Sequence, residues 1–522
     1  MIYTGCNCCC DPFFKREEDM MSRIKRILTY IENYGIRSAL SLFFEKNFQD
    51  KRRFSGRVRP VPEGMAPPTA RVTGSETSQT PPMQGGAAEH LTSLSGERIL
   101  LLVHYFYPER AGGTERFTYN LAKELMARGA FVRVLVLDAS LPRSAYTEIC
   151  GDILLREFDY DGIPCTGFRY RRSPKGLYYK NISLEDEKMR ALARHVIKRD
   201  DISLVHATYP QPFGSFLCEC HALEVPYIVT CTDFAMVCRY ATMVDKRGAL
   251  CPGSATDGCA HGSRCEGVCR GALCTSFTER HERAELILRR AAAVTVPSEF
   301  SRAVISREFP GVDPIRISHG ISEDFLSAPD RKGVRTFLYA GTLAPLKGVH
   351  ILLRAFSKLD GDYRLIISGK GSASYLRRLR RMADSRVEFI GPTSAKRMAE
   401  LYAAADCVVI PSLWYETYNF VLREAQSGGA LVVASNIGAM PESVSAGRNG
   451  FLFTPGDIDS LYTALLSASR FDFSDYERAS HPTPSGEGEE YLALILRIKN
   501  SDGKFTAHDS ERLVQNDGSQ GQ

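Results

Sequence analysis

The chain has 522 residues, which is too long for one hydrophobic core, so at least two domains are expected. Its 44% hydrophobic and 24% charged residues are those of an ordinary globular protein. Residues 15–59 hold twelve Lys/Arg and six Asp/Glu, a net of +6 that accounts for the whole excess of +5. The rest is near neutral, which argues against nucleic acid as a partner.

No apolar run approaches the roughly 18 to 20 residues that span a bilayer, and the N-terminus lacks the charged and apolar regions of a secretion signal. Nine of the 16 cysteines crowd into residues 218–274, unlike a scattered secretory disulfide framework. We therefore expect a cytoplasmic protein in a reducing compartment.

The chain is expected to begin with a basic segment, residues 1–59, followed by a Pro-, Gly-, Ser- and Thr-rich linker over 60–96. Within the first segment, residues 20–48 place Ile, Leu and Phe at helical spacing among Lys and Arg. Two interpretations stay open. The stretch either lies peripherally on the anionic inner face of the cell membrane, or packs on the protein body or in an oligomer.

Residues 97–320 alternate strand and helix patterns and form the first predicted domain. Helices are expected near 116–127, 185–198 and 281–290. The predicted strands are Arg98–Tyr107, Val132–Leu137, Leu204–Ala207, Tyr227–Thr230 and Ala293–Val296. Apolar, β-branched runs between helices predict a parallel sheet covered on both faces.

The pattern restarts in residues 321–475, the second predicted domain. Its predicted strands are Thr336–Ala340, Arg364–Ser368, Val387–Ile390, Cys407–Ile410 and Leu431–Ala434. A C-terminal helical segment over 476–499 and a disordered tail over 500–522 follow. Two doubly wound α/β domains in series leave a cleft, and such sheets bind ligands beyond the carboxyl ends of their strands.

Two glycine-containing loops of the second domain follow strands and are candidate anion sites. One is Gly341–Gly348, in which Lys347 adds a cation, and the other is Gly369-Lys370-Gly371. A glycine after a strand is more often a simple turn, so neither loop alone is specific.

Two glutamates flank the start of a helix predicted from about Phe420 to Gly428. Glu416 stands in the loop after a strand, and Glu424 lies one turn inside the helix. A carboxylate at this place can accept hydrogen bonds from paired hydroxyls such as those of a ribose. From spacing alone, both also fit ordinary surface positions.

Together these motifs resemble those of the family 4 retaining glycosyltransferases, over about residues 97–475. In the second domain the resemblance is carried by Gly341–Gly348, the glutamate pair, Gly438-Ala-Met-Pro-Glu442 and Gly450-Phe-Leu-Phe. In the first it is carried by Pro108, Gly112-Gly113-Thr114-Glu115, His206 and Ser318-His319-Gly320-Ile321.

The resemblance implies a GT-B fold, in which two Rossmann-like doubly wound domains face a central cleft. It implies that Lys347 pairs with donor phosphates, that Glu424 holds the ribose and that Glu416 holds the transferred sugar. The implied donor site comprises Gly112, Gly113, Gly341, Thr342, Lys347, Gly369, Lys370, Glu416, Asn419 and Glu424. The expected catalytic residues are Glu416, Lys347 and Asp233.

Two positions depart from the family pattern. Thr342 stands where relatives often carry Arg, so Lys347 is expected to act with fewer helpers or with Lys370 as a substitute cation. Thr232 stands where many relatives carry His, and Thr cannot relay a proton near neutral pH in the way His can. Asp233 therefore becomes the candidate for acceptor positioning.

The activity that the resemblance implies is metal-independent, retaining transfer from a UDP- or GDP-sugar to a glycan or lipid-linked acceptor, in cell-envelope or exopolysaccharide synthesis. Two alternatives remain. One is a GT-B nucleotide-sugar epimerase, which needs no acceptor. The other is a non-catalytic scaffold with a cysteine module, against which the retention of Glu416 and Glu424 speaks.

A cysteine-rich insertion is expected at 238–274 in the first domain, on the acceptor side of the cleft. Its cysteines are Cys238, Cys251, Cys259, Cys265, Cys269 and Cys274. Clustered thiolates bind structural Zn²⁺ well, but the spacing contains no C-x-x-C pair. A structural metal, disulfides and free thiols all stay open.

Overall fold

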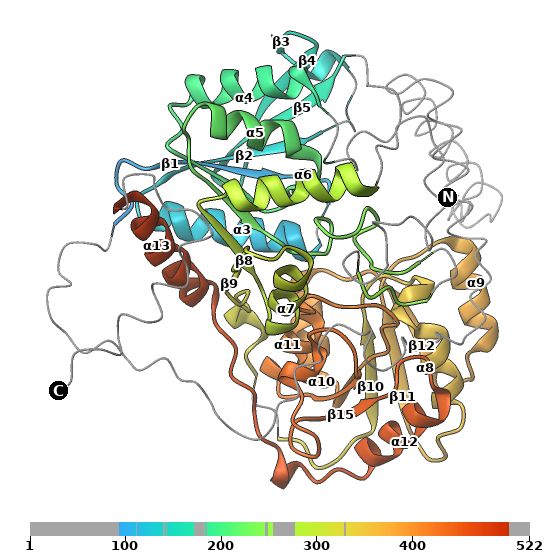
Figure 1. Ribbon diagram of the computed structural model, residues 1–522. Helices are drawn as coiled ribbons and strands as arrows, with labels where there is room; N and C mark the ends of the chain where they lie inside the picture. Colours follow the sequence, from blue (N-terminus) through green and yellow to red (C-terminus); the bar gives the residue numbers. More distant parts are fainter. Residues whose placement is uncertain are drawn as a thin grey trace, which may run out of the picture.

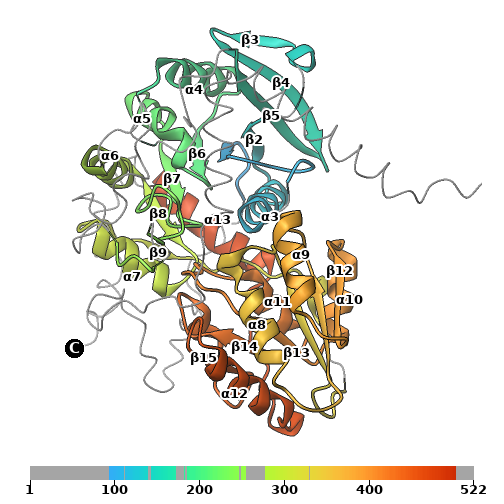
Figure 2. The same ribbon diagram turned by 90° about the vertical axis from the view of Figure 1, so that its right-hand side faces the viewer.

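The structure, a computed structural model, describes residues 93–500 except 111, 139–140, 142, 172–181, 183–184, 246–248, 254–276 and 328–329. The expectations for residues 1–59, the linker up to 92 and the tail from 501 lie outside the described residues. Figures 1 and 2 show two α/β domains, one above the other, with the last helix returning to the first. Leu94 is already buried in the core, two residues before the expected end of the linker.

The described part of the first domain forms a nine-stranded sheet in the order β3-β4-β5-β2-β1-β6-β7-β8-β9. The strands are β1 Arg98–Val103, β2 Phe131–Leu137, β3 Glu148–Cys150, β4 Ile153–Tyr160, β5 Ile163–Tyr170, β6 Leu204–Ala207, β7 Tyr227–Thr230, β8 Ala293–Val296 and β9 Ile315–Arg316. From β5 to β9 neighbours are parallel, as expected.

The edge formed by β3, β4 and β5 is antiparallel, and these strands were not predicted from the sequence. β4 and β5 are joined by Asp161 and Gly162, both at positive φ (52° and 78°). Asp-Gly is the favoured pair for a two-residue hairpin turn, so the signal was present. β1 also ends four residues early, because the chain bends at His104, whose ring stacks on Tyr209 at 3.7 Å.

Helices cover both faces of this sheet (Figure 2). They are α3 Gly113–Ala127, α4 Glu187–Arg199, α5 Gly214–Ala222, α6 Phe277–Arg290 and α7 Glu299–Glu308. α4 illustrates why they form. Asp186 caps its first turn by accepting from the Lys188 N–H at 3.0 Å, and its buried residues recur at helical spacing: Met189, Leu192, Ala193, Val196 and Ile197.

The second domain has a six-stranded sheet in the order β12-β11-β10-β13-β14-β15, parallel throughout. Its strands are β10 Thr336–Ala340, β11 Arg364–Ser368, β12 Val387–Gly391, β13 Cys407–Ile410, β14 Leu431–Ser435 and β15 Gly450–Phe453. Its helices are α8 Val349–Phe356, α9 Ala373–Met382, α10 Ala395–Ala404, α11 Phe420–Ser427 and α12 Ile458–Ser469.

In this sheet the strand order reverses between β10 and β13, which pair directly. An open α/β sheet binds ligands at such a switch point, in the crevice beyond the carboxyl ends of its strands. The loops that leave β10 and β13 are those that carry Lys347 and Glu416. The fold therefore brings two separate sequence motifs to one place.

The last helix, α13 (Pro484–Asn500), packs against α3 of the first domain. Its Glu487 accepts from the Gly320 N–H at 2.8 Å and lies 2.9 Å from His319 Nδ1. The hydroxyl of Tyr491 lies 3.2 Å from that of Thr230 in the first sheet. These buried contacts secure the connection between the domains.

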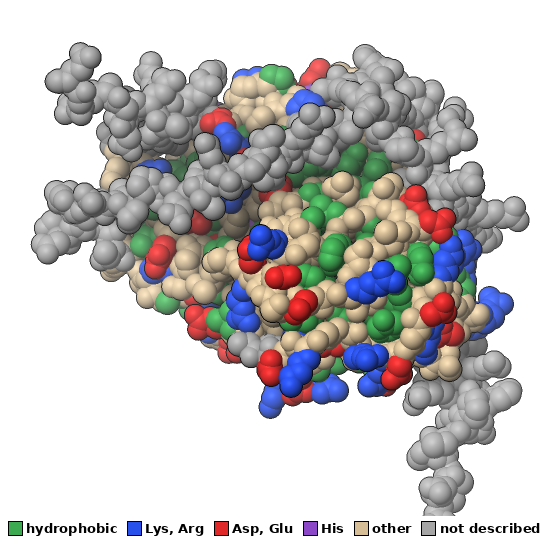
Figure 3. All heavy atoms as spheres, turned by 90° about the horizontal axis from the view of Figure 1, so that it is seen from below, with side chains coloured by type: hydrophobic (Ala, Val, Ile, Leu, Met, Phe, Trp, Pro, Cys, Tyr) green, Lys and Arg blue, Asp and Glu red, His purple; other side chains and the backbone are tan. Residues whose placement is uncertain are grey.

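Within the described residues, no helix is both long and apolar enough to cross a membrane. Figure 3 shows the molecule from below, where Lys and Arg side chains lie among Asp and Glu side chains. The described part of that face therefore carries mixed charge.

Candidate functional site

A cavity of about 1100 Å³ lies between the two domains, at the carboxyl ends of β10 and β13. The first domain contributes the start of α3 and the loop after β7. The second contributes the loops after β10 and β13 and the start of α11. Its lining residues include Gly112, Gly113, Thr114, Arg116, Thr232, Asp233, Gly341, Thr342, Lys347, Glu416, Asn419, Phe420 and Glu424.

Glu416 lies at the centre of a compact polar cluster. One of its oxygens, Oε1, accepts from Lys347 Nζ, Ser412 Oγ and Trp414 Nε1, each at 2.7 Å. Burial acts to raise the pKa of the carboxyl, but Lys347 and the two other donors outweigh it, and the pKa falls below its usual value. Glu416 is thus an ionised acceptor at the cavity wall.

The loop that presents Glu416 depends on a close approach of backbone. Gly438, at φ +63°, packs so tightly that an added Cβ would lie 2.5 Å from the Glu416 carbonyl oxygen. That oxygen also accepts from the Ala439 N–H at 2.8 Å. Glycine is required here for space and for conformation, which explains the motif Gly438–Glu442 physically.

Glu424 lies on the first turns of α11 and is only 2% exposed. Its Oε2 accepts from the Tyr402 hydroxyl at 3.0 Å, and its Oε1 pairs with Arg116. Asn419 caps the helix from a left-handed backbone conformation (φ 66°), and its side chain accepts from the Leu422 N–H at 3.0 Å. The surface interpretation of Glu424 is therefore wrong, because its carboxylate is buried between partners.

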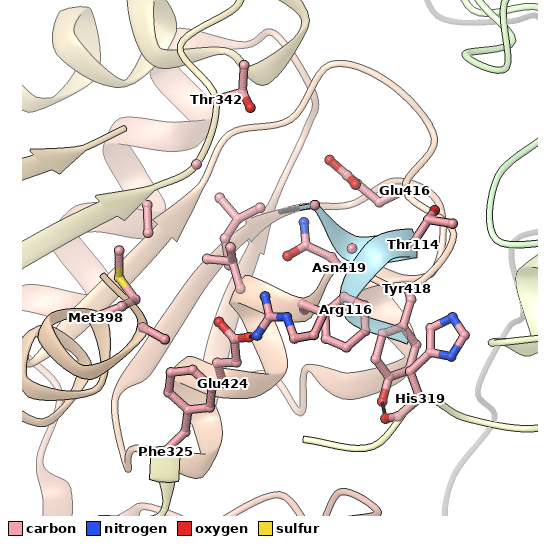
Figure 4. Close-up of a pocket in the computed structure, with 18 of the residues that line it drawn as sticks. Thr114, Arg116, His319, Phe325, Thr342, Met398, Glu416, Tyr418, Asn419 and Glu424 are labelled. Carbon is pink, nitrogen blue, oxygen red and sulfur yellow. Dashed lines mark hydrogen bonds and ion pairs between the residues drawn. The ribbon is translucent and has the colours of Figure 1, made fainter. Parts of the chain in front are cut away.

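Arg116 is the functional candidate that sequence reasoning missed. It lies on α3 of the first domain, and Figure 4 shows its guanidinium directed at Glu424 of the second. Its carbon Cζ lies 4.7 Å from the centre of the Phe420 ring. An Arg on an amphipathic helix looks like a solvated residue, and the sequence carries no signal that this one crosses a cleft.

The glycine pair at the start of α3 is closely packed, with Gly113 against the second domain and Gly112 against Glu115 of its own helix. A Cβ at Gly113 would lie 3.3 Å from the Phe420 ring, and one at Gly112 would lie 2.4 Å from the carboxylate of Glu115. Glu115 folds back over the helix start, where the backbone N–H groups of Gly112 and Glu115 partly offset the rise in its pKa that burial causes. The Thr114 hydroxyl donates to Thr232 at 3.1 Å.

Thr232 and Asp233 line the cavity from the first domain. Thr417 of the second domain donates to the Thr232 carbonyl at 2.7 Å, which joins the two walls. Asp233 accepts from the Ala235 N–H at 2.8 Å. Burial raises the pKa of Asp233 to about 7, against the opposing effects of that N–H and of Arg280. Its charge therefore changes near neutral pH.

Of the two glycine-containing loops of the second domain, only the first lines the cavity. Gly341, at φ +138°, and Thr342 line the cavity. Gly369 and Lys370 do not line it, and Lys370 is exposed. A Cβ at Gly369 would lie 1.8 Å from the Gly341 carbonyl oxygen, so close packing of the two loops requires this glycine. This arrangement does not support the expectation that Lys370 supplies the phosphate-binding cation that Thr342 lacks.

His206 lies away from the cavity. It is a fully buried residue of β6, with Nε2 2.6 Å from the Thr230 hydroxyl, and burial lowers its pKa to about 3. Its motif position thus reflects a neutral core histidine. His319, by contrast, lines the cavity, and its carbonyl accepts from the Tyr418 hydroxyl.

Of the cysteine-rich insertion, the structure describes Cys238 and Cys251, which are both buried. Burial raises the pKa of Cys238 to about 11, which disfavours a thiolate. Cys259, Cys265, Cys269 and Cys274 lie outside the described residues. The described part of the chain contains no group of three or more metal-ligating side chains. The metal, disulfide and thiol interpretations stay open.

Both domains that form the cavity match models of known protein families. Residues 112–318 match the family model of the glycosyl transferase 4-like domain, and residues 334–470 match that of glycosyl transferases group 1. Both domains of the chain are glycosyltransferase family domains. The two matches contain the motifs that surround the cavity.

Solved structures of the same fold cover most of the chain. HepE of Anabaena in complex with UDP has a TM-score of 0.51 and 18% identity, covering 77% of this chain and 99% of that one. Sucrose-phosphate synthase of Thermosynechococcus elongatus has a TM-score of 0.51 and 17% identity, covering 78% and 98%. The chain has the GT-B fold, as its sequence predicts.

Among curated proteins, the D-inositol 3-phosphate glycosyltransferases of Mycobacterium tuberculosis H37Rv and Mycobacterium bovis AF2122/97 are 36% identical over 239 residues. The match covers 41% of this chain and 49% of each relative. The chain therefore spans about half the length of the curated relatives it matches.

Proposed function

We propose that the protein is a retaining glycosyltransferase that moves a sugar from a nucleotide-sugar donor to a glycan or lipid-linked acceptor, in cell-envelope or exopolysaccharide synthesis. The observation that carries the donor site is the placement of Lys347, Glu416 and Glu424 around one cavity at the switch point of a parallel sheet. The two matched family domains support the transferase class.

In this proposal the second domain binds the donor. Glu424 accepts the ribose hydroxyls, for which each buried oxygen keeps a second lone pair. Lys347 and the first N–H groups of α11 stabilise the charge that develops on the departing diphosphate. All three donors to Glu416 among the described residues bind Oε1, so its other oxygen, Oε2, is left to accept from hydroxyls of the sugar.

The first domain orients the acceptor. Asp233 lines the cavity next to Thr232, whose carbonyl accepts from Thr417 of the Glu416 loop, and its pKa of about 7 lets it accept a hydrogen bond or proton from an acceptor hydroxyl under neutral conditions. The histidine that many relatives carry is replaced by Thr232, the residue before Asp233. Membrane attachment through residues 20–48 remains a prediction that belongs to the same hypothesis.

The test is a thermal-shift measurement with UDP, GDP and ADP, followed by a screen of nucleotide sugars for slow donor hydrolysis. UDP is the first nucleotide to try, because HepE was solved with it. A ligand bound only by the folded state raises the melting temperature by mass action. If none of the three raises it at millimolar concentration, the donor site is refuted.

Two further measurements separate the alternatives. Conversion of a nucleotide sugar to its epimer without an acceptor would replace the transferase by an epimerase. Anomeric configuration of the product by NMR decides retention. Turnover that survives EDTA supports the metal-independent mechanism, and loss of turnover that Mg²⁺ or Mn²⁺ restores would refute it.

A further inference from the structure

Arg116 joins the two domains across the cavity. It projects from α3 of the first domain, and Nη1 donates to Oε1 of Glu424 on α11 of the second (Figure 4). The guanidinium carbon lies 4.7 Å from the centre of the Phe420 ring, within the distance of a cation–π contact. This residue is thus fixed in place at the start of the helix that carries the expected ribose carboxylate.

The contact with Glu424 occupies only one of the guanidinium's nitrogen atoms, Nη1. An arginine has five N–H donors in a planar fork, and Glu424 is its hydrogen-bond acceptor among the described residues. The side chain remains 31% exposed and lines the cavity. Several donors are therefore available to a ligand in the cavity.

The cavity supplies few other cations for an anionic ligand. Of the described residues that line it, Arg116 is the only arginine, and the lysines are Lys347 and Lys396. Lys347 is paired with Glu416 at 2.7 Å, as Arg116 is with Glu424, and Thr342 carries no charge that could assist Lys347. A planar guanidinium matches phosphate oxygens in two-point contacts better than an ammonium does.

Holding Glu424 in place does not by itself account for Arg116. The second carboxylate oxygen is already fixed by the Tyr402 hydroxyl at 3.0 Å, and the residue sits within a capped helix. A cation that served only this carboxylate would need no exposed donors on the cavity side.

We propose that Arg116 binds the diphosphate of the nucleotide donor from the first domain, while its Nη1 stays paired with Glu424. The proposal rests on the proposed function and assigns a specific residue to it. One consequence is that donor binding ties both domains to the same ligand. The family domain that matches residues 112–318 thereby contributes to donor affinity as well as to the acceptor side.

The test compares two ligands by calorimetry: the nucleoside diphosphate that most raises the wild-type melting temperature, and its parent nucleoside. For Arg116→Gln we expect a loss of about 10- to 100-fold in affinity for the diphosphate, the range for hydrogen bonds to charged groups. Affinity for the nucleoside should stay within about twofold. Arg116→Lys should recover part of the loss, because it restores charge without the fork.

Two controls separate the phosphate role from side effects. Lys123→Gln removes a positive charge from the same helix, where Lys123 pairs with Asp161 outside the cavity, and should change neither affinity. Arg116→Gln also strands a buried carboxylate. The pair Glu424→Gln and Arg116→Gln/Glu424→Gln repeats the comparison without that charge, and the diphosphate-specific loss should persist.

Three results would overturn the proposal: equal losses for both ligands, which would make Arg116 a support for Glu424; unchanged affinity for both; or tighter binding of both, which would make the ion pair a block on the site. If the wild-type chain binds no nucleoside diphosphate, the proposed function itself fails, and Arg116 loses this role with it.

Discussion

The two walls of the cavity differ in how their charged groups are held. On the side of the second domain, Glu416 receives three donors on one oxygen, and Glu424 is partnered on both of its oxygens. On the side of the first domain, Asp233 accepts one backbone N–H, and its pKa lies near 7. The donors around Glu416 hold its pKa below the usual value and favour a fixed charge, whereas the raised pKa of Asp233 favours a charge that changes.

Because of this difference, the two walls suit different steps of a transfer reaction. Preorganised charges stabilise a departing diphosphate without rearrangement during the reaction. A carboxyl whose pKa lies near the working pH suits transfer or orientation of an acceptor proton. The donor wall is therefore expected to be sensitive to loss of charge, and the acceptor wall to pH.

The largest effect is expected at Lys347. Lys347→Ala removes a cation expected at the diphosphate and strands the buried Glu416 carboxylate, so kcat should fall by about 100- to 1000-fold. Steady-state kinetics with a saturating donor measure it. Lys358→Ala, which removes a surface lysine paired with Asp459, serves as the control. An unchanged kcat would place the diphosphate elsewhere.

The next effect concerns Glu424. Glu424→Gln keeps the shape but removes the charge that accepts the ribose hydroxyls, so donor affinity should fall by about 10- to 100-fold. Calorimetry with the nucleoside diphosphate measures it, and Glu388→Gln, whose carboxylate pairs with Arg364 on the surface, is the matched control. Equal affinities in the two variants would contradict the assignment.

A smaller effect distinguishes the opposite wall. The pKa of Asp233 is raised to about 7, so the carboxylate form increases as pH rises through 7. If this form positions the acceptor, kcat/KM for the acceptor should rise about tenfold between pH 6 and 8 in the wild type, since ionisation then moves from about one tenth to nine tenths. Asp233→Asn should abolish that rise, and a rise that survives would assign the titration to another group.

The smallest effect is expected at Lys370. This exposed lysine does not line the cavity, so Lys370→Ala should leave donor KM and kcat within about twofold of wild type. Kinetics alongside Lys347→Ala provide the contrast within one domain. A large loss at Lys370 would mean that the second loop closes onto the donor.

Much of the fold followed from hydrophobic patterning. β10 and β11 were predicted at their observed bounds, because each is a short apolar run whose length favours a strand over a helix. The antiparallel β3-β4-β5 edge was missed, although Asp161-Gly162 marks its hairpin. Its strands mix polar and apolar residues at an edge, where burial imposes a weaker pattern.

The site followed from the sequence in part. Glu416, Glu424 and Lys347 were singled out by spacing and by resemblance, and the structure brings them to one cavity. Lys370 shows the limit of this reasoning, since a lysine between two glycines after a strand resembles a phosphate ligand, yet this one is exposed and does not line the cavity. Whether a loop faces the cleft depends on packing between loops, here the contact of Gly369 with Gly341.

By itself, the sequence determined the two parallel sheets and the motifs that follow their strands, because these depend on local periodicity and on residue type. The tertiary structure alone decided that Arg116 crosses from one domain to Glu424 of the other, 308 residues later. Such a contact depends on the relative orientation of two domains, which the connecting segment at Gly320, α13 and the contact between Thr417 and Thr232 set together. No local pattern encodes that orientation.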